Sequence, residues 1–220
     1  MKTDLILTAD GSPTLYVSGM KEQYHSVNGA VTESKYVYAG MGYSFHPSIN
    51  PVIFEVGFGT GLNCLVTAVY AEETARRTFY TAIEKYPLDI DVVEKLNYGV
   101  FFPGRGSEIY KAIHEVPWGV EVQITPFFRL LKIKDDLTRT GWNLPTFCDV
   151  IYFDAFGPDK QPDMWSEMIF KSLYSFTSPG GILVTYSAKG EVRRRMLSAG
   201  FSTEKLPGPP GKKEMLRGIK

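Results

Sequence analysis

The stretch from Val52 to Leu65, VIFEVGFGTGLNCL, decides how the rest of the chain is interpreted. It begins with an apolar run typical of a buried strand, and a helical pattern follows it. The turn between them carries three alternating glycines, Gly57, Gly59 and Gly61. Glycine lets the backbone turn sharply and approach a ligand closely, because it has no Cβ. The stretch therefore predicts a strand, a turn with room for a nucleoside-sized ligand, and the start of a helix.

The spacing of these glycines separates two classes of nucleotide-binding loop. A dinucleotide-binding loop reads GxGxxG and needs a small residue at its last position, which is Leu62 here. An NAD-dependent enzyme is therefore a distant alternative. Together with Glu55 the motif reads ExGxGxG, which resembles motif I of the class I S-adenosylmethionine-dependent methyltransferases. A tight turn without a ligand stays open as an alternative.

The composition is that of an ordinary globular protein, with 44% hydrophobic and 22% charged residues. The 220 residues suit one domain with a short extension. No apolar run approaches the length of a membrane span, and the N-terminal residues lack the apolar core of a signal peptide. Cys64 and Cys148 lie far apart, without Cys or His companions at metal-ligand spacing. We predict a cytoplasmic protein with two free thiols and no metal.

Strands and helices are expected to alternate after the glycine motif. The predicted elements are a helix over 62–77, a strand over 79–85, a helix over 87–97, strands over 120–124 and 150–153, a helix over 164–174, a strand over 182–186 and a helix over 191–199. Residues 201–219 add a hairpin of two strands, and residues 5–17 form a small hairpin about an Asp10-Gly11 turn.

This order predicts an α/β fold, a class I S-adenosylmethionine-dependent methyltransferase (Rossmann-like) sheet. Helices cover both faces, an antiparallel hairpin ends the chain, and a small N-terminal β-hairpin precedes the sheet. We divide the chain into an N-terminal hairpin with a substrate-side loop, residues 1–48, and a methyltransferase domain, residues 49–220.

Two carboxylates stand at the ends of predicted strands. Glu84 ends the strand after the first helix, and Asp154 ends the apolar run of CDVIYFDAFGPDKQPDMW. In open α/β sheets ligands bind beyond the carboxyl ends of the strands. Glu84 is therefore expected to accept the ribose hydroxyls of an adenosyl ligand. Asp154 is expected on the acceptor side of the same crevice.

The adenine contacts are harder to assign. Many methyltransferases of this class carry an acidic residue after the third strand, which we expect over Val120 to Ile124. Thr125 and Pro126 follow instead. We consider stacking on Phe127 or Phe128, or a backbone contact, as alternatives.

The segment from Glu22 to Tyr43 has no sustained helical stripe and is long for a connector, which is typical of a functional or flexible loop. Charge is uneven at the other end of the chain. Net charge is zero, but residues 189–220 hold nine Lys or Arg against three Asp or Glu. This basic C-terminal face is where a phosphate backbone is expected, although a solvated charged face is the alternative.

Four stretches together resemble one narrower family. They are EQYHSVNGAVTES (22–34), FEVGFGTGLN (54–63), YFDAFGPDKQPDMW (152–165), and TYSAKGEVRRRMLSAGF (185–201) with PGPPGKKEMLRG (207–218). The chain resembles, from about Tyr24 to Gly218, the MnmC-like methyltransferases, that is, the methyltransferase domain of the tRNA 5-methylaminomethyl-2-thiouridine biosynthesis protein and its stand-alone relatives. The FAD-dependent oxidoreductase domain of the larger members has no counterpart in this sequence. The resemblance thus implies the stand-alone form and another source for the aminomethyl group.

The resemblance implies transfer of a methyl group from S-adenosylmethionine to the aminomethyl nitrogen of a modified wobble uridine in tRNA, giving 5-methylaminomethyl-2-thiouridine. The resemblance also implies that the catalytic aspartate of this family corresponds to Asp154, which we expect to orient the lone pair of the amine. The cofactor site is predicted from Glu55, Gly57, Phe58, Gly59, Gly61, Asn63, Glu84 and Asp154. The base pocket is predicted from Tyr24, His25, Ser26, Glu33, Phe156 and Trp165. Phosphate contacts of the tRNA anticodon stem-loop are predicted at Lys189, Arg193, Arg194, Lys212, Lys213 and Arg217.

Two alternatives stay open. One is a methyltransferase of the same fold and cofactor that acts on a small-molecule or protein amine. The other is a non-catalytic binding module that keeps the nucleoside pocket as a relic of that fold.

Overall fold

A computed structural model describes residues 3–139 and 147–220. The chain begins with a separate three-stranded antiparallel sheet of β1 (Thr3–Leu7), β2 (Pro13–Val17) and β3 (Glu22–Gln23). The hairpin between β1 and β2 confirms the one predicted about Asp10-Gly11. Asp10 holds the turn, because its carboxylate accepts hydrogen bonds from the Ser12 and Thr32 amides.

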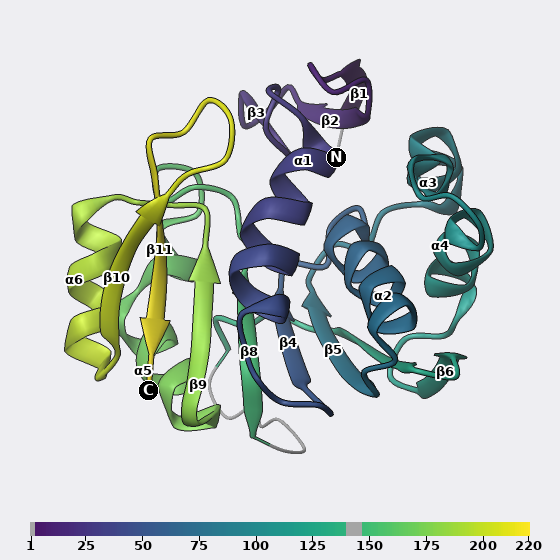
Figure 1. Cartoon of the computed structure of the whole chain (residues 1–220). Helices are drawn as coiled ribbons and strands as arrows, with labels where there is room; N and C mark the ends of the chain where they lie inside the picture. Colours follow the sequence, from purple (N-terminus) through teal and green to yellow (C-terminus); the bar gives the residue numbers. More distant parts are fainter. Residues whose placement is uncertain (1–2, 140–146) are drawn as a thin grey trace.

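The main sheet has eight strands within the described residues, in the order β10-β11-β9-β8-β4-β5-β7-β6 (Figure 1). Its parallel strands are β4 (Val52–Val56), β5 (Thr78–Glu84), β7 (Phe128–Lys134), β8 (Cys148–Phe153) and β9 (Thr177–Thr185). The antiparallel strands are β6 (Glu121–Thr125), β10 (Ser202–Pro207) and β11 (Glu214–Ile219). The predicted α/β sheet and its terminal hairpin are confirmed, and β11 inserts between β9 and β10.

Helices cover both faces of this sheet (Figure 1). One face carries α1 (Ala30–Glu33) with the π-helical segment η1 (Ser34–Ser44), α2 (Leu62–Thr74) and α4 (Gly106–Glu115). The other carries α5 (Glu167–Phe176) and α6 (Gly190–Ala199). The short segments α3 (Ile90–Leu96), η2 (Tyr98–Phe101) and η3 (Pro162–Trp165) complete the described elements.

The strand residues alternate between two hydrophobic cores, as the two-residue period of a β-strand requires. In β8, Val150 and Tyr152 pack into the core under α2 and η1, whereas Ile151 and Phe153 pack under α5 and α6. All four side chains are fully buried. The continuous apolar run before Asp154 is therefore explained by helices on both sides of one central strand.

The strand predicted over 120–124 is confirmed, but it does not lie in the parallel part of the sheet. The residues expected to form it make β6, an antiparallel edge strand, and a tight turn at Pro126 and Phe127 leads into β7. It is β7 that pairs in parallel with β5. The sequence concealed β7 because Lys132 occupies a buried position of its core-facing row beside Phe128 and Leu130.

The segment from Glu22 to Tyr43 was also predicted incorrectly as a long connector. It is helical from Ala30 onward, first as α1 and then as η1. Val37, Tyr38 and Tyr43 of η1 are buried in the core over β8 and β9. The π-helical geometry has a wider turn than the α-helix, so these residues do not repeat at the α-helical period on which the prediction relied. The division of the chain at residue 48 stays a prediction.

The other elements differ from expectation mainly at their ends. Helix α6 ends at Gly200 in the left-handed conformation, as predicted. Helix α3 begins at Ile90 rather than at the predicted Pro87, and α4 was not predicted. Both cysteines are buried, and neither forms a disulfide among the described residues. Among the residues that the structure describes, no helix is long and apolar enough to cross a bilayer.

Candidate methyl-transfer site

The glycine loop joins the ends of three strands. The amides of Gly57 and Phe58 both donate to the Ile83 carbonyl of β5, at 3.0 and 3.2 Å. Gly57 has φ +88°, and a Cβ on it would lie 2.8 Å from the Asp154 carbonyl oxygen. Glycine is required at this position for both reasons. The loop therefore fixes the distance between the cofactor side of the crevice and Asp154.

Glu84 lies at the end of β5, where its carboxylate orders the same loop. Its Oε2 accepts from the Gly59 amide at 3.0 Å, and its Oε1 accepts from the Tyr86 amide at 2.8 Å. Each oxygen has a second lone pair, and the side chain lines the crevice. Glu84 is thus held rigidly by backbone donors while it keeps acceptors for ligand hydroxyls.

Asp154 is fixed at both carboxylate oxygens. Tyr38 donates its hydroxyl to Oδ1 at 2.6 Å, and the Asn63 amide donates to Oδ2 at 2.7 Å. Burial, with a smaller contribution from the charge of Glu33, raises the pKa of Asp154 to about 7 against the lowering effect of these hydrogen bonds. Near neutral pH this carboxyl is therefore close to the midpoint of its titration.

Asn63 connects Asp154 to a second acid below the crevice. Its Nδ2 also donates to Glu55 Oε1 at 3.0 Å, and its Oδ1 accepts from the Ser34 hydroxyl. Glu55 is completely buried on β4, and burial raises its pKa well above the ordinary value. Glu55 thus supports Asn63 from behind and does not line the crevice.

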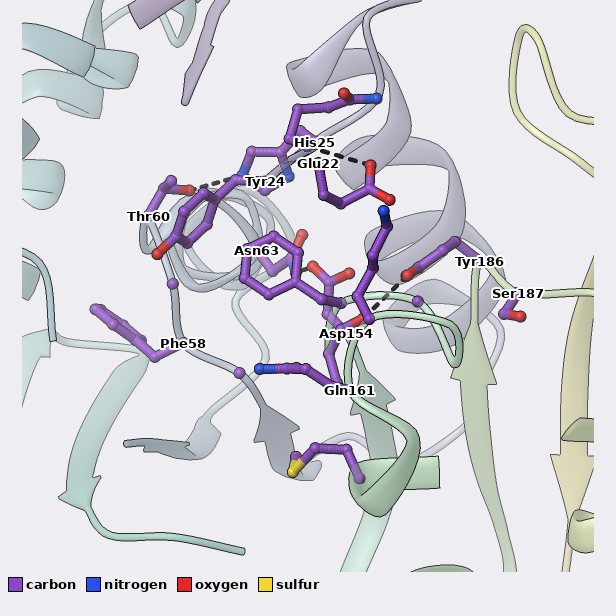
Figure 2. A pocket seen from close by; sticks show the side chains of 18 of the residues that line it. Glu22, Tyr24, His25, Phe58, Thr60, Asn63, Asp154, Gln161, Tyr186 and Ser187 are labelled. Carbon is purple, nitrogen blue, oxygen red and sulfur yellow. Dashed lines mark hydrogen bonds between the residues drawn. The ribbon is translucent and has the colours of Figure 1, made fainter. Parts of the chain in front are cut away.

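Figure 2 shows Asp154 between Tyr24 on one side and Tyr186 on the other. The Tyr24 ring packs edge-on against Phe156 with centroids 5.0 Å apart. His25 is held by a 2.7 Å hydrogen bond between its Nε2 and Thr60 Oγ1, and burial lowers its pKa to about 4. His25 is therefore neutral at physiological pH and ties the N-terminal segment to the glycine loop.

The segment after β10 closes the mouth of the crevice beside Glu33. Lys212 Nζ lies 2.7 Å from Glu33 Oε1 and 3.9 Å from the centre of the Tyr186 ring. The other oxygen of Glu33 accepts from the Ser26 amide at 2.8 Å. Residues 179 positions apart in the chain thus form one wall, and both of their charges act on Asp154.

The loop after β7 supplies acidic residues, which the sequence analysis sought after the strand at 120–124 and did not find there. Asp135 and Asp136 follow β7 directly and line the crevice. A hydrogen bond from Lys85 is the main cause that lowers the pKa of Asp136 to about 2. Of the alternatives considered for adenine, stacking on Phe128 is excluded, because Phe128 is fully buried in β7.

The crevice has a volume of about 450 Å³, and most of the predicted site residues line it. Those present are Tyr24, His25, Ser26, Glu33, Gly57, Phe58, Gly59, Asn63, Glu84, Asp154, Phe156, Lys189 and Lys212. Those outside its lining are Glu55, Gly61, Trp165, Arg193, Arg194, Lys213 and Arg217.

Two of the residues outside have clear structural contacts instead. Trp165 is fully buried and donates its indole N–H to the Phe156 carbonyl at 2.7 Å, so it shapes the Asp154 loop from the core side. Arg217 is buried too, paired with Glu204 at 2.7 Å, and its guanidinium lies over the Phe45 ring. The predicted phosphate contact of Arg217 is not supported by this placement.

Several residues that line the crevice or contact Asp154 were missed in the sequence. Tyr38 was hidden within the misassigned connector, and Asp135 and Asp136 within the polar end of β7. Tyr186 was assigned only as a strand residue, although its hydroxyl donates to the Ala155 carbonyl at 3.0 Å. Asp135 and Asp136 could have been predicted from the sequence, because an acidic residue after the third strand is common in this class of methyltransferase.

Comparison with known proteins places this site in context. A family described as S-adenosyl-L-methionine-dependent methyltransferase matches residues 130–220. The tRNA 5-methylaminomethyl-2-thiouridine biosynthesis bifunctional protein MnmC of Pseudoalteromonas atlantica is 32% identical, over 98% of this chain and 33% of that protein. The protein of that name from Aeromonas hydrophila is 30% identical, over 89% of this chain and 32% of its own length. The chain spans about a third of the length of these curated relatives.

Solved structures with the same architecture include MNMC2 from Aquifex aeolicus, with a TM-score of 0.82 and 24% identity over 99% of this chain and 70% of that one. Spermidine synthase from Thermotoga maritima has a TM-score of 0.63 and 12% identity, over 99% of this chain and 68% of that one. At these identities the likeness shows the fold.

The fold and the crevice define an S-adenosylmethionine-dependent methyltransferase. Within that class the chain is similar to MnmC over nearly all of its own length.

The residues of the crevice fit the cofactor of this class. The close approach of Gly57 to Asp154 keeps the floor of the crevice free of side-chain atoms. Glu84 offers acceptors for ribose hydroxyls, and Asp135 and Asp136 offer acceptors for an adenine amine. The wall contains Glu84, Asp135, Asp136 and Asp154, and such an acidic surface suits a ligand with a sulfonium and an ammonium group.

Proposed function

We propose that this chain methylates the aminomethyl nitrogen of a modified wobble uridine in tRNA, converting 5-aminomethyl-2-thiouridine to 5-methylaminomethyl-2-thiouridine. The observation that carries the proposal is the Asp154 carboxylate, which lies beside the glycine loop and is fixed by Tyr38 and Asn63. The similarity to MnmC supports the choice of substrate. Because tRNA modification takes place where tRNA is used, we also propose a cytoplasmic location.

The acceptor side of the crevice is built for a cationic or polar amine. Glu22, Glu33 and Asp154 line it together with the rings of Tyr24 and Phe156. Aromatic side chains commonly stack on bases that are turned out of an RNA loop. We therefore assign Tyr24 and Phe156 to the uracil ring, and the carboxylates to the aminomethyl group.

S-adenosylmethionine supplies a methyl group already activated by its positively charged sulfur, so the protein has to align the acceptor. An alkylammonium has a pKa of about 10, by analogy with lysine, and only its deprotonated form has a lone pair. Asp154 accepts a hydrogen bond from the amine N–H and directs the lone pair toward the methyl carbon. As the N–C bond forms, the S–CH3 bond would break and leave its electron pair on the sulfur of S-adenosylhomocysteine. The nitrogen becomes positively charged, and the carboxylate stabilises that charge and takes up a proton on the way to solvent.

We also propose that basic residues of the C-terminal part contact tRNA phosphates. Lys189 and Lys212 are engaged in ion pairs with Asp159 and Glu33, whereas Arg193, Arg194 and Lys213 have no ion pair among the described residues. These three residues can therefore bind phosphates without breaking an ion pair. Phosphate contacts release counterions, so tRNA affinity is expected to fall by orders of magnitude between about 50 and 200 mM salt. A filter-binding titration that shows no salt dependence would contradict these contacts.

The function is tested by nucleoside mass spectrometry on tRNA from a strain that lacks this gene. Accumulation of 5-aminomethyl-2-thiouridine is expected, and the purified protein should methylate that tRNA with labelled S-adenosylmethionine. Tyr24→Ala should reduce the transfer while cofactor binding, measured by calorimetry, changes little. A normal content of the methylated nucleoside in the deletion strain, with transfer to a small amine instead, would overturn the proposed substrate.

A further inference from the structure

A second cavity, of about 80 Å³, lies beneath the glycine loop. Its lining is Phe58, Gly59, Leu88, Ile90, Val93, His114, Trp118 and Lys132. Phe58 and Gly59 are shared with the crevice, whereas Glu84 and Asp154 line the crevice alone. The cavity is therefore a separate space on the other side of the loop, and it takes no part in the methyl transfer described above.

Lys132 is the unusual member of this lining. It lies on β7 with 1% of its surface exposed. Its Nζ donates one hydrogen bond, to the His114 carbonyl at 3.1 Å. It also lies 5.0 Å from the centre of the Trp118 ring and 5.6 Å from that of Phe58. No ion pair of Lys132 occurs within residues 3–139 and 147–220.

Among the described residues, no acidic side chain is paired with this lysine. Burial lowers the pKa of Lys132 to about 8, which leaves the ammonium charged at neutral pH. Burial also lowers the pKa of His114 to about 3, so that His114 is neutral. The cavity lining contains no Asp or Glu. A buried charge without a partner is costly, and aromatic faces offset only part of that cost.

Lys132 lines the cavity, which can therefore hold a partner for its remaining donors. An ammonium has three N–H groups, and the His114 carbonyl accounts for one. A cavity needs about 10–15 Å³ to hold a water molecule, so this one has room for an ion and accompanying water. Its other walls are the aliphatic and aromatic side chains of Leu88, Val93 and Trp118. Such walls exclude large, strongly hydrated or multiply charged ions.

We propose that this cavity binds a small monovalent anion, of chloride or formate size, on the Lys132 ammonium. The anion supplies the missing counter-charge and fills the space beneath Phe58 and Gly59. Occupancy of the cavity therefore stabilises the glycine loop from the side opposite to the cofactor crevice.

Thermal unfolding tests the proposal with salts exchanged at constant ionic strength. Replacing sodium gluconate by sodium chloride, or in a second arm by sodium formate, should raise the Tm of the wild-type chain by about 2–4 °C. Lys132→Met should abolish this difference. Lys134→Met, on the same strand but exposed, should respond as the wild type does. A wild-type Tm that is equal in all three salts, or an unchanged response of Lys132→Met, would overturn the proposal.

Crystals of the wild-type protein soaked in sodium bromide give a second test, which does not depend on the variant folding. An anomalous peak within hydrogen-bond distance of Lys132 Nζ is expected. Absence of a peak in this cavity, in crystals that show bromide elsewhere on the surface, would contradict anion binding.

Discussion

Replacement of Asp154 by asparagine is expected to lower kcat/KM for methyl transfer by about 10²–10⁴-fold, the range for a positioned acid–base group. Asparagine keeps the size of the side chain and can still meet the Tyr38 hydroxyl, but it cannot stabilise the positive charge that develops on the acceptor nitrogen. Steady-state kinetics with labelled S-adenosylmethionine and tRNA from the deletion strain measure the loss. Affinity for the cofactor should change much less.

Asp163→Asn is the matched control. Asp163 lies in the same loop region, on η3, but its side chain is exposed and it does not line the crevice. Its replacement should leave kcat/KM within about a factor of two, as expected for a surface substitution away from the site. If Asp154→Asn kept near-normal turnover with saturating tRNA, the role assigned to Asp154 would be wrong.

The pH profile gives a signature that a structural role of Asp154 would not produce. Its raised pKa, about 7, means that the ionised form required for transfer is lost as the pH falls through 7. In the wild type, the slope of log kcat/KM against pH should therefore decrease by one unit as the pH rises through 7. This break should be missing in Asp154→Asn. Glu33→Gln should move it to lower pH, because the Glu33 charge raises the pKa of Asp154.

Gly57→Ala is expected to damage both stability and cofactor binding. The φ of +88° costs a non-glycine residue about 1–2 kcal/mol, and the overlap of Cβ with the Asp154 carbonyl, at 2.8 Å, adds about 1–3 kcal/mol. The nearest atoms belong to the backbone of Asp154 and Ala155, just after a central strand, so they cannot move aside easily. We expect the free energy of unfolding to fall by about 2–5 kcal/mol, measured by urea denaturation, and cofactor affinity to fall with it.

Gly104→Ala separates the two causes. Gly104 has φ +77°, but nothing lies within 4 Å of the position of its Cβ. It should therefore lose only the conformational part, about 1–2 kcal/mol, and keep wild-type cofactor affinity. If both variants lost the same free energy of unfolding, the close approach of Gly57 to Asp154 would not contribute to the effect of Gly57→Ala.

The predictable part of this protein is the part governed by local patterns. The glycine motif, Glu84 and Asp154 were identifiable because each follows an apolar run, and parallel strands bring their carboxyl ends to one edge. The terminal hairpin was identifiable for a similar reason, since its strands flank a turn rich in proline and glycine. These patterns depend on neighbours in the sequence and need no knowledge of tertiary contacts.

The parts that were missed depend on tertiary contacts. Lys132 occupies a core position, so the β7 sequence did not look like a buried strand. Asp135 and Asp136 were therefore not recognised as the acidic residues that follow a parallel strand. Tyr38 meets Asp154 only because η1 packs across β8 and β9. Glu33 and Lys212 are paired across almost the whole chain. The hydrophobic periodicity of a single segment cannot predict such contacts between distant segments.

The position of β11 between β9 and β10 has a consequence for synthesis on the ribosome. Until residues 214–219 have emerged, β9 has a free edge and β10 has no strand to pair with. Free strand edges are sites of wrong pairing. The nascent chain therefore carries an incomplete sheet through most of its translation, and the wall formed by Glu33 and Lys212 closes only when the last strands are in place.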